Sequence, residues 1–314
     1  MQGLELSKAY FEAYGKPMLE TQFADILPYL AAGLIGSGSE CFGFDDTVST
    51  DHDFEPGFCL FLPGEEIVDR KQAFALERAY AKLPKAFMGF ERSMLSPVGG
   101  ARHGVIRLED FLEEKLGVKD GALSNAQWLL LPEQSLAELT NGEIFFDNFG
   151  LLSDIRARFS RFPEDIRRKK LAGNLLLMAQ AGQYNFKRCI DHGEFAAAQL
   201  AVGEFVKAAM HVIFLLNHQY QPYYKWSFRA LRTLPKLSLE AEIFEYLLTT
   251  PNDGEMAEEK YYAIEGVCAD VIDELVSQDL TKAICGDLEK HAYSVNDGIE
   301  DAGLRNMNIF AGSN

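Results

Sequence analysis

Two aspartates, one residue apart, are the side chains in this sequence best suited to chemistry. Asp51 and Asp53 lie on either side of His52, and alternate side chains of an extended backbone point to the same face. Two carboxylates held that close repel each other unless a cation lies between them. Oxygen ligands favour Mg²⁺ or Mn²⁺ over zinc. We therefore predict that Asp51 and Asp53 hold a divalent metal ion, whereas His52, on the opposite face, is packed or hydrogen-bonded.

A glycine-serine turn precedes the two aspartates. Gly38 and Ser39 are small, so the backbone N–H groups around them can approach an anion closely. A Gly-Ser pair alone is a common turn, and an Asp-x-Asp pair alone is common on protein surfaces. Here a short apolar run precedes the turn and another follows the aspartates. This combination favours phosphoryl or nucleotidyl transfer, which needs a phosphate cradle beside a metal.

The elements that would position these residues form an α/β pattern in residues 1–124. We predict helices in residues 4–30, with a break at 15–17, and in residues 64–90 and 109–116. We predict buried strands in residues 30–35 and 58–62 and a third short strand in residues 105–108. The order of helix, strand, strand, helix, strand, helix is typical of an α/β domain with a small mixed sheet.

The pattern becomes helical after about residue 124. Apolar residues recur with helical spacing, and breakers are few, in residues 172–190, 195–220, 239–248 and 256–287. We interpret residues 125–314 as an all-α, helical-bundle domain that binds substrate. Residues 141–147 could form a small hairpin or turn, and the basic run at residues 167–170 is interpreted as a solvated helix face.

Composition and charge limit the possible partners. The chain has 314 residues, is 47% hydrophobic and carries a net charge of -17, which argues against broad binding to nucleic acid or anionic membranes. Its five cysteines are widely spaced and form no C-x-x-C, as in reduced cytoplasmic proteins. We see no secretory signal and no run of about 18 apolar residues. We therefore expect a cytoplasmic protein without a membrane span.

The segment from Gly38 to Asp53 resembles the motif of the nucleotidyltransferase superfamily, which includes aminoglycoside and lincosamide nucleotidyltransferases. Gly38, Ser39, Gly43, Asp51 and Asp53 match that motif, although the residue between the aspartates is usually apolar. The stretch looks still more like an uncharacterised bacterial branch, the domain of unknown function 4037, in which Asp-His-Asp is normal. Residues 131–134, 140–143, 162–165 and 223–226 look like that branch as well.

The resemblance implies a nucleotidyltransferase-like α/β domain followed by a helical substrate domain. It implies that Gly38 and Ser39 hold the phosphates of a nucleoside triphosphate, and that Asp51 and Asp53 hold Mg²⁺. Lys225 lies among three aromatic residues after Pro222, where its ammonium can reach phosphates. The alternative for Lys225 is aromatic packing at a helix joint, with the ammonium in water.

Active members of the superfamily usually carry a third carboxylate on a later strand. The predicted strand at residues 105–108 contains none, but Glu109 at its end would alternate onto the face of Val105 and is our candidate ligand or base. Glu143 and Asp147, placed by the prediction in the helical domain, are alternatives. We expect a metal-dependent nucleotidyltransferase that moves an NMP from a nucleoside triphosphate to a hydroxyl acceptor and releases pyrophosphate, and we favour a small molecule as the acceptor. The alternative is a catalytically inactive nucleotide-binding or interaction protein with the same fold.

Overall fold

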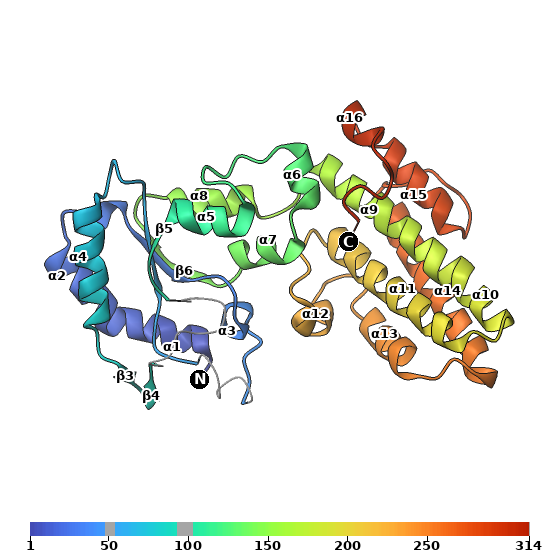
Figure 1. The fold of residues 1–314 in the computed structure, drawn as a ribbon, viewed down its shortest axis with the longest axis horizontal. Coiled ribbons are helices and arrows are strands. Elements are labelled where there is room, and N and C mark those ends of the chain that lie inside the picture. The colour runs from blue at the N-terminus through green and yellow to red at the C-terminus, as the bar shows by residue number, and fades with distance from the viewer. Residues whose placement is uncertain (48–53, 93–102, 314) are drawn as a thin grey trace. The chain divides into compact units, whose positions relative to one another are not determined.

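The computed structural model describes residues 1–47, 54–92 and 103–313 (Figure 1). The chain forms two compact units. The first consists of Met1–Leu123 and Ser135–Ser160, and the second of Ser124–Gln134 and Arg161–Asn314. The predicted boundary at residue 124 assigned residues 135–160 to the second domain, but these residues belong to the first unit. They return to it because they carry a strand that pairs with the central part of its sheet.

The first unit is built on a mixed sheet of four strands. In the order β5-β2-β1-β6, these are Gly104–Arg107, Cys59–Leu62, Ala31–Leu34 and Glu143–Asp147. β1 is antiparallel to both β2 and β6, whereas β2 is parallel to β5. The three strands predicted from apolar runs are confirmed. The segment expected as a small hairpin or turn instead forms the edge strand β6.

Helices cover both faces of this sheet. They are α1 (Gly3–Tyr10), α2 (Lys16–Gln22), α3 (Ser39–Phe42), α4 (Arg70–Ala81), α5 (Leu108–Leu116), α7 (Glu133–Thr140) and α8 (Leu151–Arg158). Side chains alternate along β2, so Leu60 and Leu62 point to one face and Phe61 to the other. Leu60 and Leu62 join the core with α1, α2 and α4, whereas the ring of Phe61 lies 5.2 Å from that of Phe111 in α5. Figure 1 shows α4 on one side of the strands and α5 and α8 on the other. The first unit is therefore a mixed α/β fold, with a small β3–β4 hairpin at Ala86–Phe87 and Phe90–Glu91.

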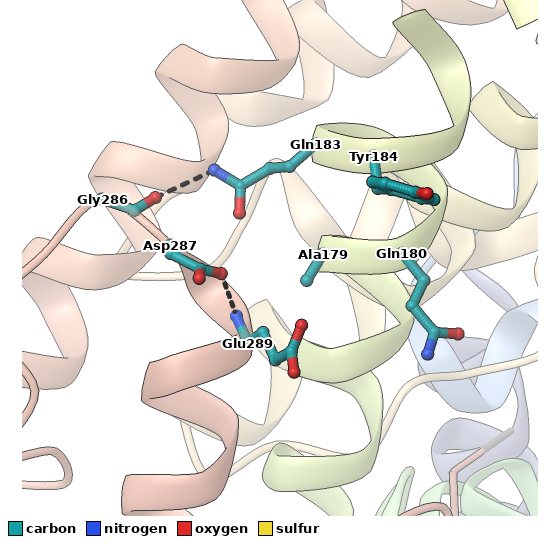
Figure 2. Close-up of a pocket in the computed structure, with 7 residues that line it drawn as sticks. All are labelled: Ala179, Gln180, Gln183, Tyr184, Gly286, Asp287 and Glu289. Carbon is teal, nitrogen blue, oxygen red and sulfur yellow. Dashed lines mark hydrogen bonds between the residues drawn. The ribbon is translucent and has the colours of Figure 1, made fainter. Parts of the chain in front are cut away.

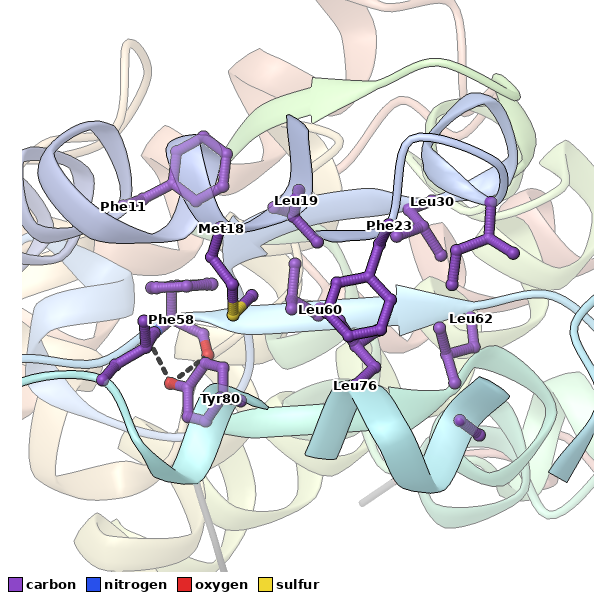
Figure 3. Close-up of a cluster of buried hydrophobic side chains, with 14 of the residues drawn as sticks. Phe11, Met18, Leu19, Phe23, Leu30, Phe58, Leu60, Leu62, Leu76 and Tyr80 are labelled. Carbon is purple, nitrogen blue, oxygen red and sulfur yellow. Dashed lines mark hydrogen bonds between the residues drawn. The ribbon is translucent and has the colours of Figure 1, made fainter. Parts of the chain in front are cut away.

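The buried cluster on the α4 face also contains one satisfied polar group (Figure 3). The Tyr80 hydroxyl accepts a hydrogen bond from the Phe58 amide at 3.0 Å and donates one to the Phe58 carbonyl at 2.7 Å. Burial raises the pKa of Tyr80, so the phenol stays neutral. These bonds satisfy the backbone of Phe58 just before β2 begins.

The predicted helix break at residues 15–17 is a change of helical pitch. α1 continues through the π-helix η1, Phe11–Gly15, directly into α2. In this wider turn the Lys16 N–H donates to the Phe11 carbonyl, five residues earlier. Pro17 lacks an N–H but lies in the first turn of α2, where proline is tolerated.

Every element of the second unit in the described residues is helical. They are α6 (Asn125–Leu130), α9 (Glu164–Met178), the π-helix η4 (Ala179–Phe186), α10 (Lys187–Asp191), α11 (Phe195–Leu216), α12 (Tyr224–Leu231), α13 (Glu240–Thr249), α14 (Gly254–Ser277), α15 (Leu288–Asp297) and α16 (Ala302–Arg305). Among the helices described, α11 alone has the length and apolar composition of a membrane span. About 72% of its apolar window is buried inside the protein, which makes it the core helix of this unit.

The prediction that the basic run at residues 167–170 is a solvated helix face is wrong. Most of this run is buried in α9. Lys169 and Lys170 are both 0% exposed. The Lys169 ammonium donates to the Asn296 side chain and to the Met307 carbonyl, both at 2.9 Å. The Lys170 ammonium donates to the Gly312 carbonyl at 3.2 Å. Burial lowers the pKa of both lysines, and the C-terminal segment supplies oxygen atoms that satisfy them.

Glu240 is another buried titratable group in this unit. It is 5% exposed at the start of α13, and its carboxyl group hydrogen-bonds that of Asp270 in α14. Burial and this neighbouring carboxylate raise the pKa of Glu240 to about 7. Since an unfolded glutamate ionises near pH 4.5, the folded protein holds a proton there that the unfolded chain loses.

We predict that Glu240→Gln removes a pH-dependent loss of stability. In the wild type the free energy of unfolding should fall as the pH rises from about 4.5 to about 7, because Glu240 must then ionise while buried; the loss should be about 2 kcal/mol. Urea unfolding of both proteins from pH 4 to 8 measures this. Glu242→Gln, at an exposed position of the same helix, is the control. Parallel pH profiles for wild type and Glu240→Gln would contradict the assignment.

Candidate functional site

The turn between β1 and α3 has a backbone that requires glycine. Gly36 and Gly38 have φ angles of +125° and +138°, which side chains with a Cβ rarely adopt. A Cβ on Gly38 would also lie 2.4 Å from the carboxylate of Glu40. Gly38 is the N-cap of α3 and Ser39 its first residue, so the predicted glycine-serine turn is where the strand meets the helix.

Asn141 holds this turn from a distant part of the sequence. Its Oδ1 accepts a hydrogen bond from the Gly36 amide at 3.0 Å, and its Nδ2 donates to the Gly36 carbonyl at 2.8 Å. The following amide, of Gly142, donates to the Cys41 carbonyl in α3 at 2.8 Å. We call these contacts of Asn141 and Gly142 with the turn the clamp. The guanidinium of Arg156 donates to the carbonyls of Thr140 and Asn141 and so fixes the clamp in turn.

The clamp depends on a close approach of two backbones. A Cβ on Gly142 would lie 1.9 Å from the Leu34 carbonyl oxygen, and Gly142 has a φ of +62°. A Cβ on Gly33 would lie 2.5 Å from the Glu143 carbonyl oxygen. Only glycine at these positions lets β6 lie against the end of β1, where the register shifts between Ala32 and Gly33.

The predicted metal ligands Asp51 and Asp53 lie outside the described residues. Within the part of the chain that is described, no group of three or more His, Cys, Asp or Glu side chains could hold a metal ion. One described carboxylate oxygen near the turn, Asp45 Oδ1, is buried without a hydrogen bond, whereas Oδ2 accepts from the Gly3 amide at 2.7 Å. Such an oxygen fits a hard cation better than zinc.

The candidates for a third carboxylate lie in different environments. Glu109 is exposed in the first turn of α5, since the chain turns helical directly after Arg107, so strand alternation does not place it on the face of Val105. Glu143 and Asp147 belong to β6 of the first unit rather than to the helical domain. Asp147 accepts hydrogen bonds from the amides of Gly150 and Ser153 and so caps α8.

Glu143 is half-buried beside the turn. It pairs in register with Leu34, the last residue of β1, and its carboxylate forms an ion pair with Lys8 of α1. Of the three candidates, Glu143 is the one on the sheet beside the glycine turn.

Lys225 lies in the first turn of α12, in the second unit. Its ammonium lies 4.8 Å from the centroid of the Trp226 ring, and its side chain is exposed. The rings of Tyr223 and Tyr224 lie against each other, with centroids 4.2 Å apart. The two tyrosine rings therefore contact each other, and the Lys225 ammonium lies over the Trp226 ring while its side chain remains exposed.

A buried polar network below Lys225 escaped the sequence analysis. Glu133 is 3% exposed, its Oε2 accepts from the Gln221 amide at 3.2 Å, and its Oε1 lies 3.3 Å from His211 Nδ1. Burial alone would raise the pKa of Glu133, but His211, Lys170 and the Gln221 amide together lower it. The only local signal for this network is a glutamate directly after Pro132, at the start of α7. The sequence spacing of Glu133, His211 and Gln221 does not indicate that they are in contact.

The second unit also has a cavity of about 530 Å³ between η4 and the start of α15 (Figure 2). Its lining includes the carboxylates of Asp287 and Glu289 and the amides of Gln180 and Gln183. Figure 2 shows Gln183 donating to the Gly286 carbonyl, and Asp287 accepting from the Glu289 amide. With two carboxylates and no cation among the described lining residues, this cavity disfavours a polyphosphate.

A family model described as "Domain of unknown function (DUF4037)" matches residues 128–227. The matched segment contains Glu133, Asn141, Glu143 and Lys225, but not the glycine-serine turn. No curated protein and no solved structure matches the chain. The chain is therefore similar to this family over the segment that supplies the clamp, β6 and the Lys225 turn.

We predict that Asn141→Ala destabilises the protein by about 1–3 kcal/mol, because it removes both hydrogen bonds to the Gly36 backbone. Urea unfolding at neutral pH measures the change. Asn148→Ala is the matched control, since that exposed amide donates a single side-chain hydrogen bond, to the Leu27 carbonyl. Equal losses in the free energy of unfolding of the two variants would show that the clamp stabilises the protein no more than a single exposed hydrogen bond does.

Proposed function

We propose that this protein is a metal-dependent nucleotidyltransferase that moves an NMP from a nucleoside triphosphate to a hydroxyl acceptor. The observation that carries the proposal is the turn between β1 and α3, where two positive-φ glycines precede Ser39 and Asn141 fixes the backbone. A glycine- and serine-rich turn that is held in one conformation is suited to phosphate oxygens. Its position between a strand and a helix supports a nucleotidyltransferase-like first domain followed by a helical substrate domain.

In this proposal the chain mainly binds and orients the reactants. The Gly38 and Ser39 backbone and the Ser39 hydroxyl hold the phosphates, and Asp51 and Asp53 hold Mg²⁺ or Mn²⁺. When bound, the metal supplies charge neutralisation for the triphosphate. The acceptor oxygen forms a bond to the α-phosphorus, the bond from that phosphorus to the leaving oxygen breaks, and pyrophosphate departs. The hydroxyl proton passes to a carboxylate of the chain.

The most suitable carboxylate for that proton is Glu143. It lies on β6 next to the end of β1, whereas Glu109 is exposed on a helix and Asp147 is occupied as the cap of α8. The net charge of -17 favours a neutral or cationic small molecule over a nucleic acid as the acceptor. None of the five cysteines, all of which the structure describes, forms a disulfide.

The second candidate function is nucleotide binding without transfer. It is favoured by the position of Glu109, because the strand β5 that precedes it carries no carboxylate in its described residues, Gly104–Arg107. Such a protein would bind the triphosphate at the same turn but would leave the acceptor hydroxyl without a base.

We predict that one of ATP, GTP, CTP or UTP, with Mg²⁺, raises the melting temperature by several degrees, because a ligand bound only to the folded state stabilises it. The double variant Asp51→Ala, Asp53→Ala should lose this shift while keeping the melting temperature of the ligand-free wild type. If no triphosphate gives a shift that depends on the two aspartates, both candidate functions are wrong.

We predict that Glu143→Gln lowers the rate of pyrophosphate release by about 100-fold or more, as expected for the loss of a general base. The assay uses the triphosphate that gives the thermal shift, with a panel of sugars, amino sugars and nucleosides as acceptors. Glu109→Gln should change the rate by less than about twofold. A large loss in Glu109→Gln alone would assign the base to α5, and no release with any acceptor would favour the binding protein.

A further inference from the structure

The residues that directly precede β2 are held by side chains from other elements. They are residues 54–58, which follow Asp53 in the sequence, and we call them the anchored segment. The ring of Phe54 lies against that of Phe90 in β4, with centroids 4.8 Å apart. Asp51 and Asp53 lie outside the described residues. The anchored segment is therefore the described part of the chain that is closest in sequence to both aspartates.

Each backbone carbonyl from Pro56 to Phe58 accepts a side-chain hydrogen bond. Arg92 Nε donates to the Pro56 carbonyl at 2.9 Å. The hydroxyl of Ser7 in α1, which is 1% exposed, donates to the Gly57 carbonyl at 2.6 Å. The Phe58 carbonyl accepts from the tyrosine hydroxyl of α4 that Figure 3 shows. Three separate parts of the chain thus satisfy this short stretch of backbone just before it joins the sheet.

Arg92 is itself held between two buried aromatic rings. Its guanidinium carbon lies 5.2 Å from the ring centroid of Tyr10 and 4.8 Å from that of Tyr80. Its Nη2 also donates to the Tyr10 hydroxyl at 3.0 Å. These rings are 0% and 7% exposed. A guanidinium stacked on two buried rings has a fixed orientation, so it presents Nε to the Pro56 carbonyl in one direction.

His103, the residue before β5, contacts the anchored segment at two points. Its Nδ1 lies 3.4 Å from Glu55 Oε1, and its side chain is 9% exposed. A Cβ on Gly57 would lie 2.6 Å from the Cγ and Nδ1 of His103, so the imidazole ring lies directly against the Gly57 backbone. The next amide, of Gly104, donates to the Phe58 carbonyl at 2.9 Å. The start of β5 is therefore attached to the anchored segment by side-chain and backbone contacts.

The anchored segment lies at the end of the sheet where the glycine-serine turn begins. Since β1 and β2 are antiparallel, with Gly33 opposite Cys59, the end of β1 lies beside the start of β2. The turn follows Leu34, and Glu143 pairs with Leu34 from β6. The contacts that follow the two aspartates are therefore made beside the turn that is proposed to hold phosphates, where a metal bound to those phosphates would be needed.

We propose that Ser7, Arg92 and His103 are positioning residues, which hold the chain directly after Asp53 and so keep the metal-binding carboxylates in place beside the turn. The inference rests on the proposed function for the role of the two aspartates. Metal ligands bind well only when the groups behind them fix their orientation. The three side chains act through the backbone and through Glu55, and need not touch the metal.

Binding of Mn²⁺ alone tests the inference. The free ion gives an EPR signal that is lost on binding, so a titration measures affinity without nucleotide or turnover. The wild type should bind Mn²⁺, and the double variant Asp51→Ala, Asp53→Ala should not. His103→Ala should weaken this binding by about 10–100-fold, as expected for the loss of a residue that orients a ligand. His103→Asn, whose amide can donate from the place of Nδ1, should restore most of it.

Three further variants test the backbone contacts. Ser7→Ala and Arg92→Ala each remove a donor to a carbonyl of the anchored segment, and each should weaken Mn²⁺ binding by about tenfold or more. Gly57→Ala should do the same in the wild type, because the added Cβ displaces the imidazole ring. In the His103→Ala background it should have no further effect, since the ring is gone.

Leu112→Ala and Thr21→Val are the controls. Leu112 is 3% exposed in α5, across the sheet from α4, so its truncation destabilises the first unit without touching the anchored segment (Figure 1). The Thr21 hydroxyl donates to the Pro17 carbonyl at 2.7 Å, which is the kind of bond that Ser7 makes. Urea unfolding measures the stability of every variant. Both controls should bind Mn²⁺ like the wild type at a temperature at which all the proteins are folded.

Two results would overturn the inference. One is an Mn²⁺ affinity in His103→Ala, Ser7→Ala and Arg92→Ala that falls no further than in Leu112→Ala, since contacts that only stabilise the fold give this result. The other is Mn²⁺ binding in the wild type that does not depend on the two aspartates. The thermal shift with triphosphates judges the proposed function separately. Weakened Mn²⁺ binding in the three variants, without a triphosphate shift in the wild type, would support the positioning residues and refute the proposed function.

Discussion

Asn141 makes the contact on which the candidate phosphate turn depends. One amide side chain satisfies both backbone groups of Gly36, 105 residues earlier in the sequence. This contact requires β6 to lie against the end of β1, which in turn requires glycine at positions 33 and 142. The turn, the edge strand and the carboxylate of Glu143 are therefore parts of one arrangement, and none of them can be placed without the others.

The local features of this arrangement were predictable from the sequence. β1 and β2 are apolar and fully buried, β5 is half-buried, and short strands bounded by glycine or proline are recognisable without knowledge of their partners. The glycine-serine turn follows from the need for a positive φ and for small side chains. Each of these signals is contained within a few consecutive residues.

The features that were predicted wrongly depend on contacts between segments that are distant in the sequence. β6 is half-buried along its length, and its place beside β1 depends on the contact of Asn141 with Gly36, 105 residues earlier in the sequence. Likewise, residues 167–170 have the composition of a solvated face and are buried because a segment about 140 residues later covers two of them. The network of Glu133, His211 and Gln221 also joins residues up to 88 positions apart.

The two buried ammonium groups of α9 also set an order of events during synthesis. Lys170 finds its carbonyl partner at Gly312, 142 residues downstream. A ribosome that adds ~5–20 residues per second needs roughly 7–28 s to make that distance. Until then Lys169 and Lys170 must stay hydrated, since an unpartnered ammonium is costly to bury. The helical unit therefore completes its interior only after translation has passed Gly312, whereas the strands of the first unit are all present once residue 147 has been made.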